Sequence, residues 1–337
     1  MRPAQVTHQS DIESSSYIVC RMTFVGADLG GTKLAVAAFT SEGEVISREV
    51  APLDGRRGVA VASLIAERLQ GLIAEHKSDA AGVCVPGLYR ADRGTVWAPN
   101  ISGWDDYPLL QELRASLGPA VRVTIDSDRA AYILGETWRG AARDARDAIF
   151  LAIGTGIGAG ILSGGSVLRG HGDVAGAIGW LALDRPFMPR YRQHGCLEDQ
   201  ASGPGLVRVA RDLMHADVNY AGVLGSKDPE DLDASDVFAA YERGDRIALE
   251  VIDNAIELWG MAVANLVSLF NPEIIVFGGG VFGPGAKFLD RIHTEARRWA
   301  QPIAIEQVRL VVSSLGSDAG LFGAGRLAMM AAEGVSA

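Results

Sequence analysis

The spacing of apolar and polar positions predicts two strand-rich segments, each built around a glycine-containing turn. In the first segment, apolar runs between polar turns predict a three-stranded meander with strands at 23–28, 34–39 and 45–50. In the second, the apolar run 149–153 leads into the glycine-rich heptapeptide 154–160, and a further apolar run ends at the Gly-Gly pair 164–165. This pattern predicts a β-hairpin with a glycine-rich bend over 149–169.

Apolar residues at helical spacing, with charged residues between them, predict helices between and after these segments. The expected helices are 59–75, 108–117, 129–139, 205–215, 234–241, 246–270, 286–300 and 319–332. Short apolar runs predict further strands at 81–85, 121–125, 273–277 and 308–313. A strand–turn–strand unit followed by alternating helices and strands therefore occurs twice, so we expect a duplicated α/β protein with two lobes and a central cleft.

The two repeats also predict where the chain divides. We expect an N-terminal α/β lobe over 22–125 and a C-terminal α/β lobe over 126–337, with the C-terminal helix able to pack back on the N-terminal lobe. Residues 1–21 are polar and serine-rich and have no periodicity, which is typical of a disordered extension. Met22 stands directly before the first predicted strand and is an alternative start of translation.

Composition describes a globular chain and excludes several classes of protein. Of the 337 residues, 48% are hydrophobic and 21% are charged, and no apolar run reaches the roughly 18 residues of a membrane span. The N-terminal residues lack the apolar core of a secretory signal, so we expect a cytoplasmic protein with no membrane partner. Three widely spaced cysteines do not make a disulfide framework. A net charge of −10 leaves no basic surplus to displace counterions, which argues against nucleic acid as a partner.

The candidate chemistry lies at the turns. Glycines at 154, 156, 158 and 160 leave backbone N–H groups accessible, which suits the binding of a polyanion, although a glycine-rich hairpin in any β-rich domain has the same pattern. A second bare turn at 278–280 follows the strand expected at 273–277. Asp128 follows the strand expected at 121–125, and strand ends are where the sites of α/β proteins gather. A lone Asp in such a place is more often a helix N-cap.

Six motifs occur in a fixed order along the chain. They are Asp28-Leu-Gly-Gly-Thr-Lys33, Ala98-Pro-Asn-Ile-Ser-Gly-Trp104, Asp128 ahead of Leu134-Gly-Glu136, Gly154-Thr-Gly-Ile-Gly-Ala-Gly160, Gly195-Cys-Leu-Glu198 and Asn271-Pro-Glu-Ile-Ile-Val-Phe-Gly-Gly-Gly280. Together they resemble the ROK family of bacterial sugar kinases (repressor, open reading frame, kinase), which has the two-lobed actin-like ATPase (ribonuclease H-like) fold. The resemblance covers about residues 22–332, and the combination is far more specific than any single motif.

The resemblance implies ATP and Mg²⁺ bound between the lobes and phosphoryl transfer to a primary hydroxyl of a hexose-like substrate. Asp28 would hold the hydrated Mg²⁺. The residues implied around the phosphates are Gly30, Gly31, Thr32 and Lys33 from one lobe and Gly154, Thr155 and Gly156 from the other. The residues implied under the adenosine are Gly278, Gly279 and Gly280. Phosphoryl transfer depends on positioning and charge neutralisation, which aimed N–H donors supply.

The same resemblance implies the residues that meet the sugar. Asp128 matches the family's catalytic aspartate and would accept the proton of the attacking hydroxyl as general base. Asn100 and Glu198 match positions that hydrogen-bond the sugar. By themselves, the first residue is an ordinary loop Asn and the second an ordinary acid at a helix start, so their role rests on the family motifs.

The sequence departs from the family in one region. The family's Glu-x-Gly-His segment, whose histidine also binds zinc, reads Ala177-Ile-Gly-Trp180 here. Only Cys196 remains of the cysteine cluster, with Tyr191, Gln193 and His194 nearby, so we expect no structural zinc. Ser127 replaces the family's Asn before the base, and with Trp180 it is expected to alter the sugar pocket. An amino sugar, a deoxy sugar or a C7-cyclitol then fits as well as glucose.

Three alternatives to this hypothesis differ in function. An ordinary glucokinase shares the chemistry and differs only in the acceptor. A ROK-type repressor carries an N-terminal helix-turn-helix domain, for which the roughly 20 residues before the first strand are too few. A non-catalytic sugar-binding relative has no need of Asp128 and both phosphate turns. We also expect a homodimer, because family members commonly pair and the helix at 246–270 has an apolar face broader than one sheet contact requires.

Overall fold

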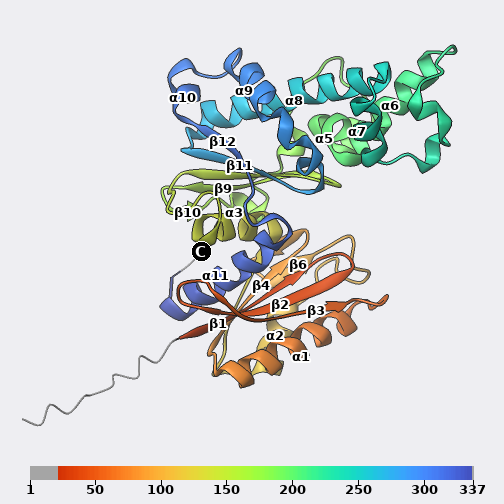
Figure 1. Ribbon diagram of the computed structural model, residues 1–337. Coiled ribbons are helices and arrows are strands. Elements are labelled where there is room, and N and C mark those ends of the chain that lie inside the picture. The colour runs from red at the N-terminus through yellow and green to blue at the C-terminus, as the bar shows by residue number, and fades with distance from the viewer. Residues whose placement is uncertain (1–21, 336–337) are drawn as a thin grey trace, which may run out of the picture.

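The computed structural model describes residues 22–335, which form two lobes stacked on one another (Figure 1). The predictions for residues 1–21 and for the start of translation concern a segment outside the described residues. Within residues 22–335, no helix is long and apolar enough to cross a membrane. The two-lobed α/β architecture agrees with the prediction.

The N-terminal lobe is built on a five-stranded sheet in the order β3-β2-β1-β4-β7. Its strands are β1 (Thr23–Leu29), β2 (Lys33–Thr40), β3 (Val45–Pro52), β4 (Ala80–Val85) and β7 (Arg122–Ser127). The first three form the predicted antiparallel meander, and β4 and β7 are added in parallel. In the register, Asp28 pairs with Ala35 of β2 and with Cys84 of β4. The helices α1 (Val59–His76) and α2 (Leu109–Leu117) cover the outer face.

The C-terminal lobe repeats this topology with the order β10-β9-β8-β11-β12. Its strands are β8 (Ala148–Ile153), β9 (Ile157–Ser163), β10 (Ser166–Val167), β11 (Ile274–Gly278) and β12 (Arg309–Val312). The antiparallel hairpin of β8 and β9 encloses the glycine-rich bend, and β11 and β12 run parallel to β8. Two sheets of one topology in one chain confirm the predicted duplication.

Two helices lie between the sheets (Figure 1). They are α3 (Asp128–Arg139) and α11 (Ala319–Glu333), which pack against each other. The C-terminal helix α11 rests on β1, β4 and β7 of the N-terminal sheet, whereas α3 rests on β8 and β9 of the C-terminal sheet. Because α3 begins at the end of β7, Asp128 is placed at the junction of the two lobes.

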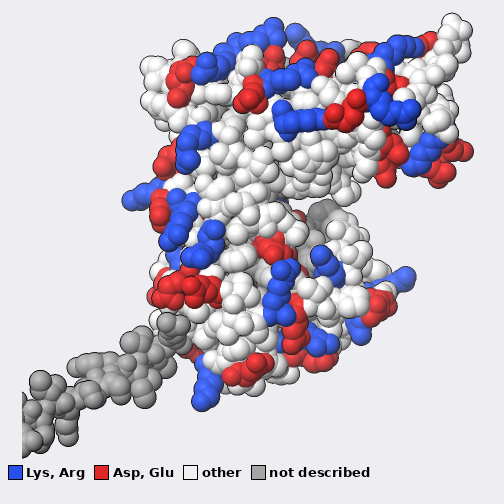
Figure 2. Space-filling view, viewed as in Figure 1, with Lys and Arg blue, Asp and Glu red and all other residues white. Residues whose placement is uncertain are grey.

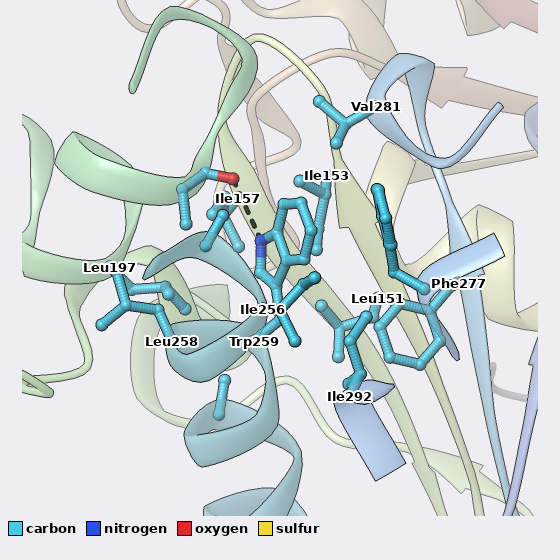
Figure 3. Packing of buried hydrophobic residues seen from close by; sticks show 14 of the residues in the cluster. Leu151, Ile153, Ile157, Leu197, Ile256, Leu258, Trp259, Phe277, Val281 and Ile292 are labelled. Atoms are coloured by element: carbon cyan, nitrogen blue, oxygen red, sulfur yellow. Dashed lines mark hydrogen bonds between the residues drawn. The ribbon is translucent and has the colours of Figure 1, made fainter. Parts of the chain in front are cut away.

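Helices cover the outer face of the C-terminal sheet. They are α5 (Cys196–Ala201), α6 (Gly203–Ala216), α7 (Ala234–Glu242), α8 (Arg246–Phe270), α9 (Leu289–Arg297) and α10 (Pro302–Gln307). Trp259 of α8 is buried in this core, and its Nε1 donates to the carbonyl of Ala201 at 3.1 Å (Figure 3). Contacts with α5, α6, α7, α9 and α10 cover most of the apolar face of α8. The breadth of that face is therefore explained within one chain, which removes it as an argument for a homodimer.

Some short elements are absent from the prediction. A separate two-stranded sheet consists of β5 (Leu88–Arg90) and β6 (Thr95–Trp97), and α4 (Tyr191–His194) lies in a segment for which no helix is predicted. The 3₁₀ turns are η1 (His171–Asp173), η2 (Ile178–Trp180), η3 (Val223–Ser226), η4 (Pro229–Asp231), η5 (Gly280–Phe282), η6 (Pro284–Phe288) and η7 (Gly316–Asp318). The helix expected over 286–300 is shorter than predicted, because its first residues belong to η6.

Candidate active site

A cavity of about 630 Å³ lies between the lobes, where Figure 2 shows the molecule hollowed on one side. It collects residues from all six sequence motifs. The residues of the predicted site that line it are Asp28, Asn100, Asp128, Gly154, Thr155, Gly156, Trp180, Glu198 and Gly279. Segments far apart in the sequence thus meet at one place, with Asp28 and Asn100 from one lobe and the glycine-rich bend from the other.

A second cavity of about 660 Å³ adjoins the first at Gly154 and Thr155. Its walls are mostly apolar and come from the start of α6, from α7 and from η5. The apolar lining residues are Pro204, Val207, Leu232, Phe238, Val281 and Pro284. Gly280 also lines this cavity, next to Gly279 in the main one. The bend at 154–156 therefore lies where the two cavities meet.

Some predicted site residues do not line the main cavity. Gly31 and Thr32 line a neighbouring hollow that shares Asn100 with it. Gly30 donates its N–H to the Lys33 carbonyl at 2.9 Å inside the turn, and the exposed Lys33 acts on the site only through its charge. Gly278 is buried under the ring of Phe150, so only the next two glycines reach the cavities.

The structure corrects the expectation that Ser127 lines the sugar pocket. Its hydroxyl accepts the backbone N–H of Tyr89 at 3.1 Å, and its side chain faces a small separate hollow beside Asp126. Asp126 forms an ion pair with Arg169 there. Ser127 is the last residue of β7 and Asp128 the first residue of α3, and of the two only Asp128 lines the main cavity.

Glu198 connects the main cavity to the glycine-rich bend. Its Oε2 accepts the N–H of Ile157 at 2.7 Å, and a Cβ atom on Gly156 would lie 2.9 Å from the same oxygen. Burial raises the pKa of the Glu198 carboxyl, while the Ile157 N–H lowers it. A glycine at 156 is thus needed for this close approach, and the residue that holds the bend also lines the main cavity.

Two carboxyl groups at the floor of the cavity are unusually basic. Burial raises the pKa of Asp28 to about 6, against the lowering effect of the Cys84 thiol and the Lys33 charge. Burial also raises the pKa of Asp128 to about 6, and the negative charge of Asp28 adds to this shift. The Arg129 charge and its backbone N–H, 2.7 Å from Asp128 Oδ1, oppose it. Two acids that compete for ionisation favour a cation or a proton between them.

These two acids should make the ligand-free protein less stable at neutral pH. Their folded pKa of about 6 exceeds the ordinary aspartate pKa of 3.8, so between about pH 4 and pH 6 the folded state binds more protons than the unfolded state. Stability therefore falls as pH rises through this window. We expect Asp28→Asn and Asp128→Asn each to raise the free energy of unfolding at pH 7 by on the order of 1–3 kcal/mol. Melting curves at pH 7 and pH 4.5 check this, because the gain should shrink at the lower pH; an equal gain at both would contradict it.

The glycines of the bend serve two purposes that the sequence does not distinguish. Gly154 and Gly156 face the cavities, whereas Gly160 lies in β9 under α3. A Cβ atom on Gly160 would collide with the carbonyl oxygen of Arg129 at the start of α3. Gly158 lines the cavity but also leaves room for the Arg129 side chain. The last glycines of the motif therefore allow the helix that carries Asp128 to approach the sheet.

Adding a methyl group at this contact should destabilise the fold. We expect Gly160→Ala to lower the free energy of unfolding by about 1–3 kcal/mol, because the α3 backbone must move away. Gly71→Ala is the matched control, since Gly71 lies in α1 and a Cβ atom added there has no other atom within 4 Å. This variant should raise the free energy of unfolding by up to about 1 kcal/mol, because alanine favours a helix more than glycine does. Urea denaturation measures both. A Gly160→Ala variant as stable as the wild type would contradict this packing.

Hydrogen bonds and ion pairs anchor the segment around Cys196. Asp184 accepts from the Tyr191 hydroxyl at 3.1 Å and from Gln200 at 3.2 Å. The fully buried Asp199 forms ion pairs with Arg190 at 2.6 Å and with Arg208 at 2.9 Å. In the part of the chain that the structure describes, no group of three His, Cys, Asp or Glu side chains could hold a metal ion. The absence of zinc remains a prediction.

Sequence reasoning missed several residues of the site. An apolar wall of the cavity consists of Leu88, Trp97 and Val174 together with Trp180. Trp97 is 41% exposed, Val174 50% and Trp180 55%, which is unusual for large apolar side chains. Nothing in their spacing predicts this wall, because it assembles from β5, β6 and the segment after β10. Tyr132 also lines the cavity. It lies one helical turn after Asp128, so the i, i+4 spacing could have identified it.

Most of the chain is similar in sequence and in structure to known proteins of one family. The sequence profile of the ROK family matches residues 24–331. A glucokinase from Halalkalibacterium halodurans is 33% identical over 312 residues, which are 90% of this chain and 94% of that protein. The crystal structure of a ROK hexokinase from Thermus thermophilus superposes with a TM-score of 0.77 at 31% identity, covering 93% of this chain and 100% of that one. A ROK family glucokinase from Streptomyces griseus, in complex with glucose and AMPPNP, gives 0.70 at 29% identity, covering 91% and 99%.

Proposed function

Because the chain belongs to the ROK family, we propose that it is an ATP-dependent kinase that phosphorylates the primary hydroxyl of a hexose-like acceptor. The observation that carries this proposal is the position of Asp128. It lines the same cavity as the bend at 154–156 and as Asp28, so a base, a phosphate cradle and a candidate Mg²⁺ ligand share one space. That set is what phosphoryl transfer to an alcohol requires.

The donor binds on the side of the C-terminal lobe. The second cavity, which begins at Gly154 and Thr155 and is lined in part by Val207 and Phe238, suits a nucleoside. Gly280 lines this cavity and Gly279 the main one, and the bend offers N–H groups to the phosphates. Asp28 suits a hydrated Mg²⁺, since it lines the cavity and forms no ion pair with a basic side chain of residues 22–335. Magnesium at this position supplies charge neutralisation and orientation of the phosphate oxygens.

Asp128 activates the acceptor. Its Oδ1 is occupied by the Arg129 N–H, which leaves Oδ2 to accept the proton of the acceptor hydroxyl. As that proton leaves, the hydroxyl oxygen forms a bond to the γ-phosphorus and the bond between this phosphorus and the bridging oxygen breaks, so that ADP departs. A pKa of about 6 keeps Asp128 mostly ionised at neutral pH yet basic enough to take the proton. The turnover rate should fall as pH drops below about 6.

The cavity wall supports an acceptor other than plain glucose. Trp180 and Ala177 stand on the acceptor side together with Trp97 and Val174, and none of them offers a carboxylate or an imidazole to a sugar hydroxyl. Hydroxyl groups turned toward this wall would lose water without gaining a partner. We therefore place an amino sugar, a deoxy sugar or a C7-cyclitol ahead of glucose. Glucose is the second candidate, because the related enzyme from Halalkalibacterium halodurans is a glucokinase.

A panel of acceptors tests this proposal. ADP release is followed with Mg-ATP alone and with glucose, amino sugars, deoxy sugars and cyclitols that carry a free hydroxymethyl group. We expect release that depends on the acceptor, with kcat/KM higher for one of the analogues than for glucose. ADP release that no acceptor stimulates would favour a regulator or a non-catalytic sugar-binding relative instead. A cytoplasmic location, where ATP is available, and the lack of a nucleic-acid partner belong to the same proposal.

We also propose that the enzyme is a homodimer. Its support is a group of exposed apolar side chains at the ends of α8 and α9 and in α10, namely Leu269, Trp299 and Ile303, which are 72%, 60% and 66% exposed. Light scattering at micromolar concentration should give twice the chain mass, and Ile303→Arg should shift it toward one chain. Val218→Arg is the control, since Val218 is 92% exposed outside this group. A monomeric wild type would contradict the proposal.

A further inference from the structure

We propose that Tyr132 is a further catalytic residue, whose hydroxyl donates a hydrogen bond to the phosphoryl group during its transfer. This inference rests on the kinase function proposed above. None of the six sequence motifs that predict the site contains Tyr132.

The helix α3 aims Tyr132 at the reacting groups. Asp128 is the first residue of α3, and Tyr132 follows one turn later on the same side of the helix. Both residues line the cavity between the lobes, together with Asp28. The ring of Tyr132 packs against Phe150 of β8, with centroids 5.1 Å apart and planes tilted by 41°. This contact holds the ring in one place on the strand that leads into the bend at 154–156.

The hydroxyl of Tyr132 is without a hydrogen-bond partner in the described part of the chain. Within residues 22–335 no group forms a hydrogen bond with it, although the ring is largely enclosed. The hydroxyl is not sealed off either, since it does not belong to the buried unpaired atoms of the described chain and the residue lines the cavity. Buried tyrosine hydroxyls usually find a partner. A partnerless hydroxyl that opens into the reaction cavity is a donor available to a ligand.

The charges around this hydroxyl define what it can do. Burial raises the pKa of Tyr132, and the negative charges of Asp128 and Asp28 raise it further. The phenol therefore keeps its proton and acts as a neutral donor. A phosphoryl group that passes from the donor near Asp28 to the hydroxyl near Asp128 carries negative charge on its peripheral oxygens. A fixed donor beside this path stabilises the transition state more than the ground state.

The test is Tyr132→Phe, which keeps the ring against Phe150 and removes only the donor. We expect kcat to fall roughly 10²-fold, as for the loss of one donor to a transition-state oxyanion. The KM of the acceptor and the Kd of a non-hydrolysable ATP analogue should stay within about twofold. The acid limb of the pH profile should also stay, because it belongs to Asp128. Tyr220→Phe is the matched control, since its hydroxyl bonds to Asp245 at 2.7 Å away from the cavity, and its kcat should not change.

The outcomes separate this inference from the function on which it rests. An active wild type with a Tyr132→Phe variant within twofold of its kcat would overturn the role of Tyr132 alone. A fall in kcat accompanied by weaker nucleotide binding and a lower melting temperature would assign Tyr132 a packing role and overturn it as well. A wild type without acceptor-dependent turnover would overturn the kinase function and the role of Tyr132 together.

Discussion

Replacing Asp128 by asparagine should lower kcat by about 10²–10⁴-fold while the affinity for nucleotide stays nearly unchanged. The amide still accepts the N–H of Arg129, so the local structure at the start of α3 is kept. It cannot take the proton of the acceptor hydroxyl at neutral pH, and this loss is what the kinetics should report. Steady-state turnover with the best acceptor, together with calorimetric binding of an ATP analogue, measures the two effects separately.

The control for this variant is Asp173→Asn. Asp173 lies near the junction of the lobes and accepts the N–H of Ala91 at 3.0 Å, but it does not line the cavity. Its kcat should stay within about twofold of the wild type, since an asparagine accepts the same hydrogen bond. If Asp128→Asn keeps more than about a tenth of the wild-type kcat, Asp128 is not the general base.

Restoring polar groups on the apolar wall should change which acceptor is preferred. We expect the double variant Trp180→His, Ala177→Glu to raise kcat/KM for glucose about 10–100-fold, because each added group can bond a sugar hydroxyl that the wild type leaves without a partner. The ratio of kcat/KM for glucose to kcat/KM for a deoxy analogue should also rise. A site that hydrogen-bonds a hydroxyl discriminates against an analogue that lacks this hydroxyl. Elemental analysis of the wild type should find no stoichiometric zinc.

Phe187→His is the control for the wall variant. Phe187 belongs to the same irregular segment and is 61% exposed, but it lies outside the cavity lining. This variant should leave the acceptor preference unchanged. Stoichiometric zinc in the wild type would contradict the prediction that the protein binds none. A wild type that prefers glucose to every analogue would contradict the proposed effect of the apolar wall on acceptor preference.

The duplicated fold could be predicted because each repeat has a strong periodic signal. Alternation over 23–50 and over 149–169 predicted both hairpin units, and the helix at 246–270 was predicted with its observed bounds. Elements of three or four residues, such as β5 and α4, escaped because so few residues carry no period. The sequence of a helix also does not identify the elements that will cover its apolar face. That is why the face of α8 was assigned in part to a second copy.

The candidate site could be predicted as a set of motifs but not as a set of side-chain directions. The motifs placed Asp28, Asp128 and the bend at 154–156 correctly around one cavity. The Ser127 hydroxyl is turned toward the backbone N–H of Tyr89, and the role of Gly160 depends on the approach of α3. Both are properties of tertiary packing.

Long-range pairs were the least predictable part. Asp199 is fully buried between two arginines, one from the segment after η2 and one from α6, and no sequence spacing connects the three. The two ion pairs of the buried Asp199 carboxylate hold α5 in place. Because Glu198 belongs to the same helix, they also fix its position. Tyr132 differs, since it follows Asp128, the proposed base, at a spacing of one helical turn that can be read from the sequence.

The most direct test of the kinase is the fate of the γ-phosphoryl group. ATP labelled in that group is incubated with Mg²⁺, the enzyme and the best acceptor of the panel, and the products are separated and analysed by mass spectrometry. The label should appear on the primary hydroxyl of the acceptor, with one ADP for each acceptor phosphorylated, and the transfer should be nearly lost in Asp128→Asn. Label found only in inorganic phosphate, or transfer that Asp128→Asn leaves intact, would contradict the account.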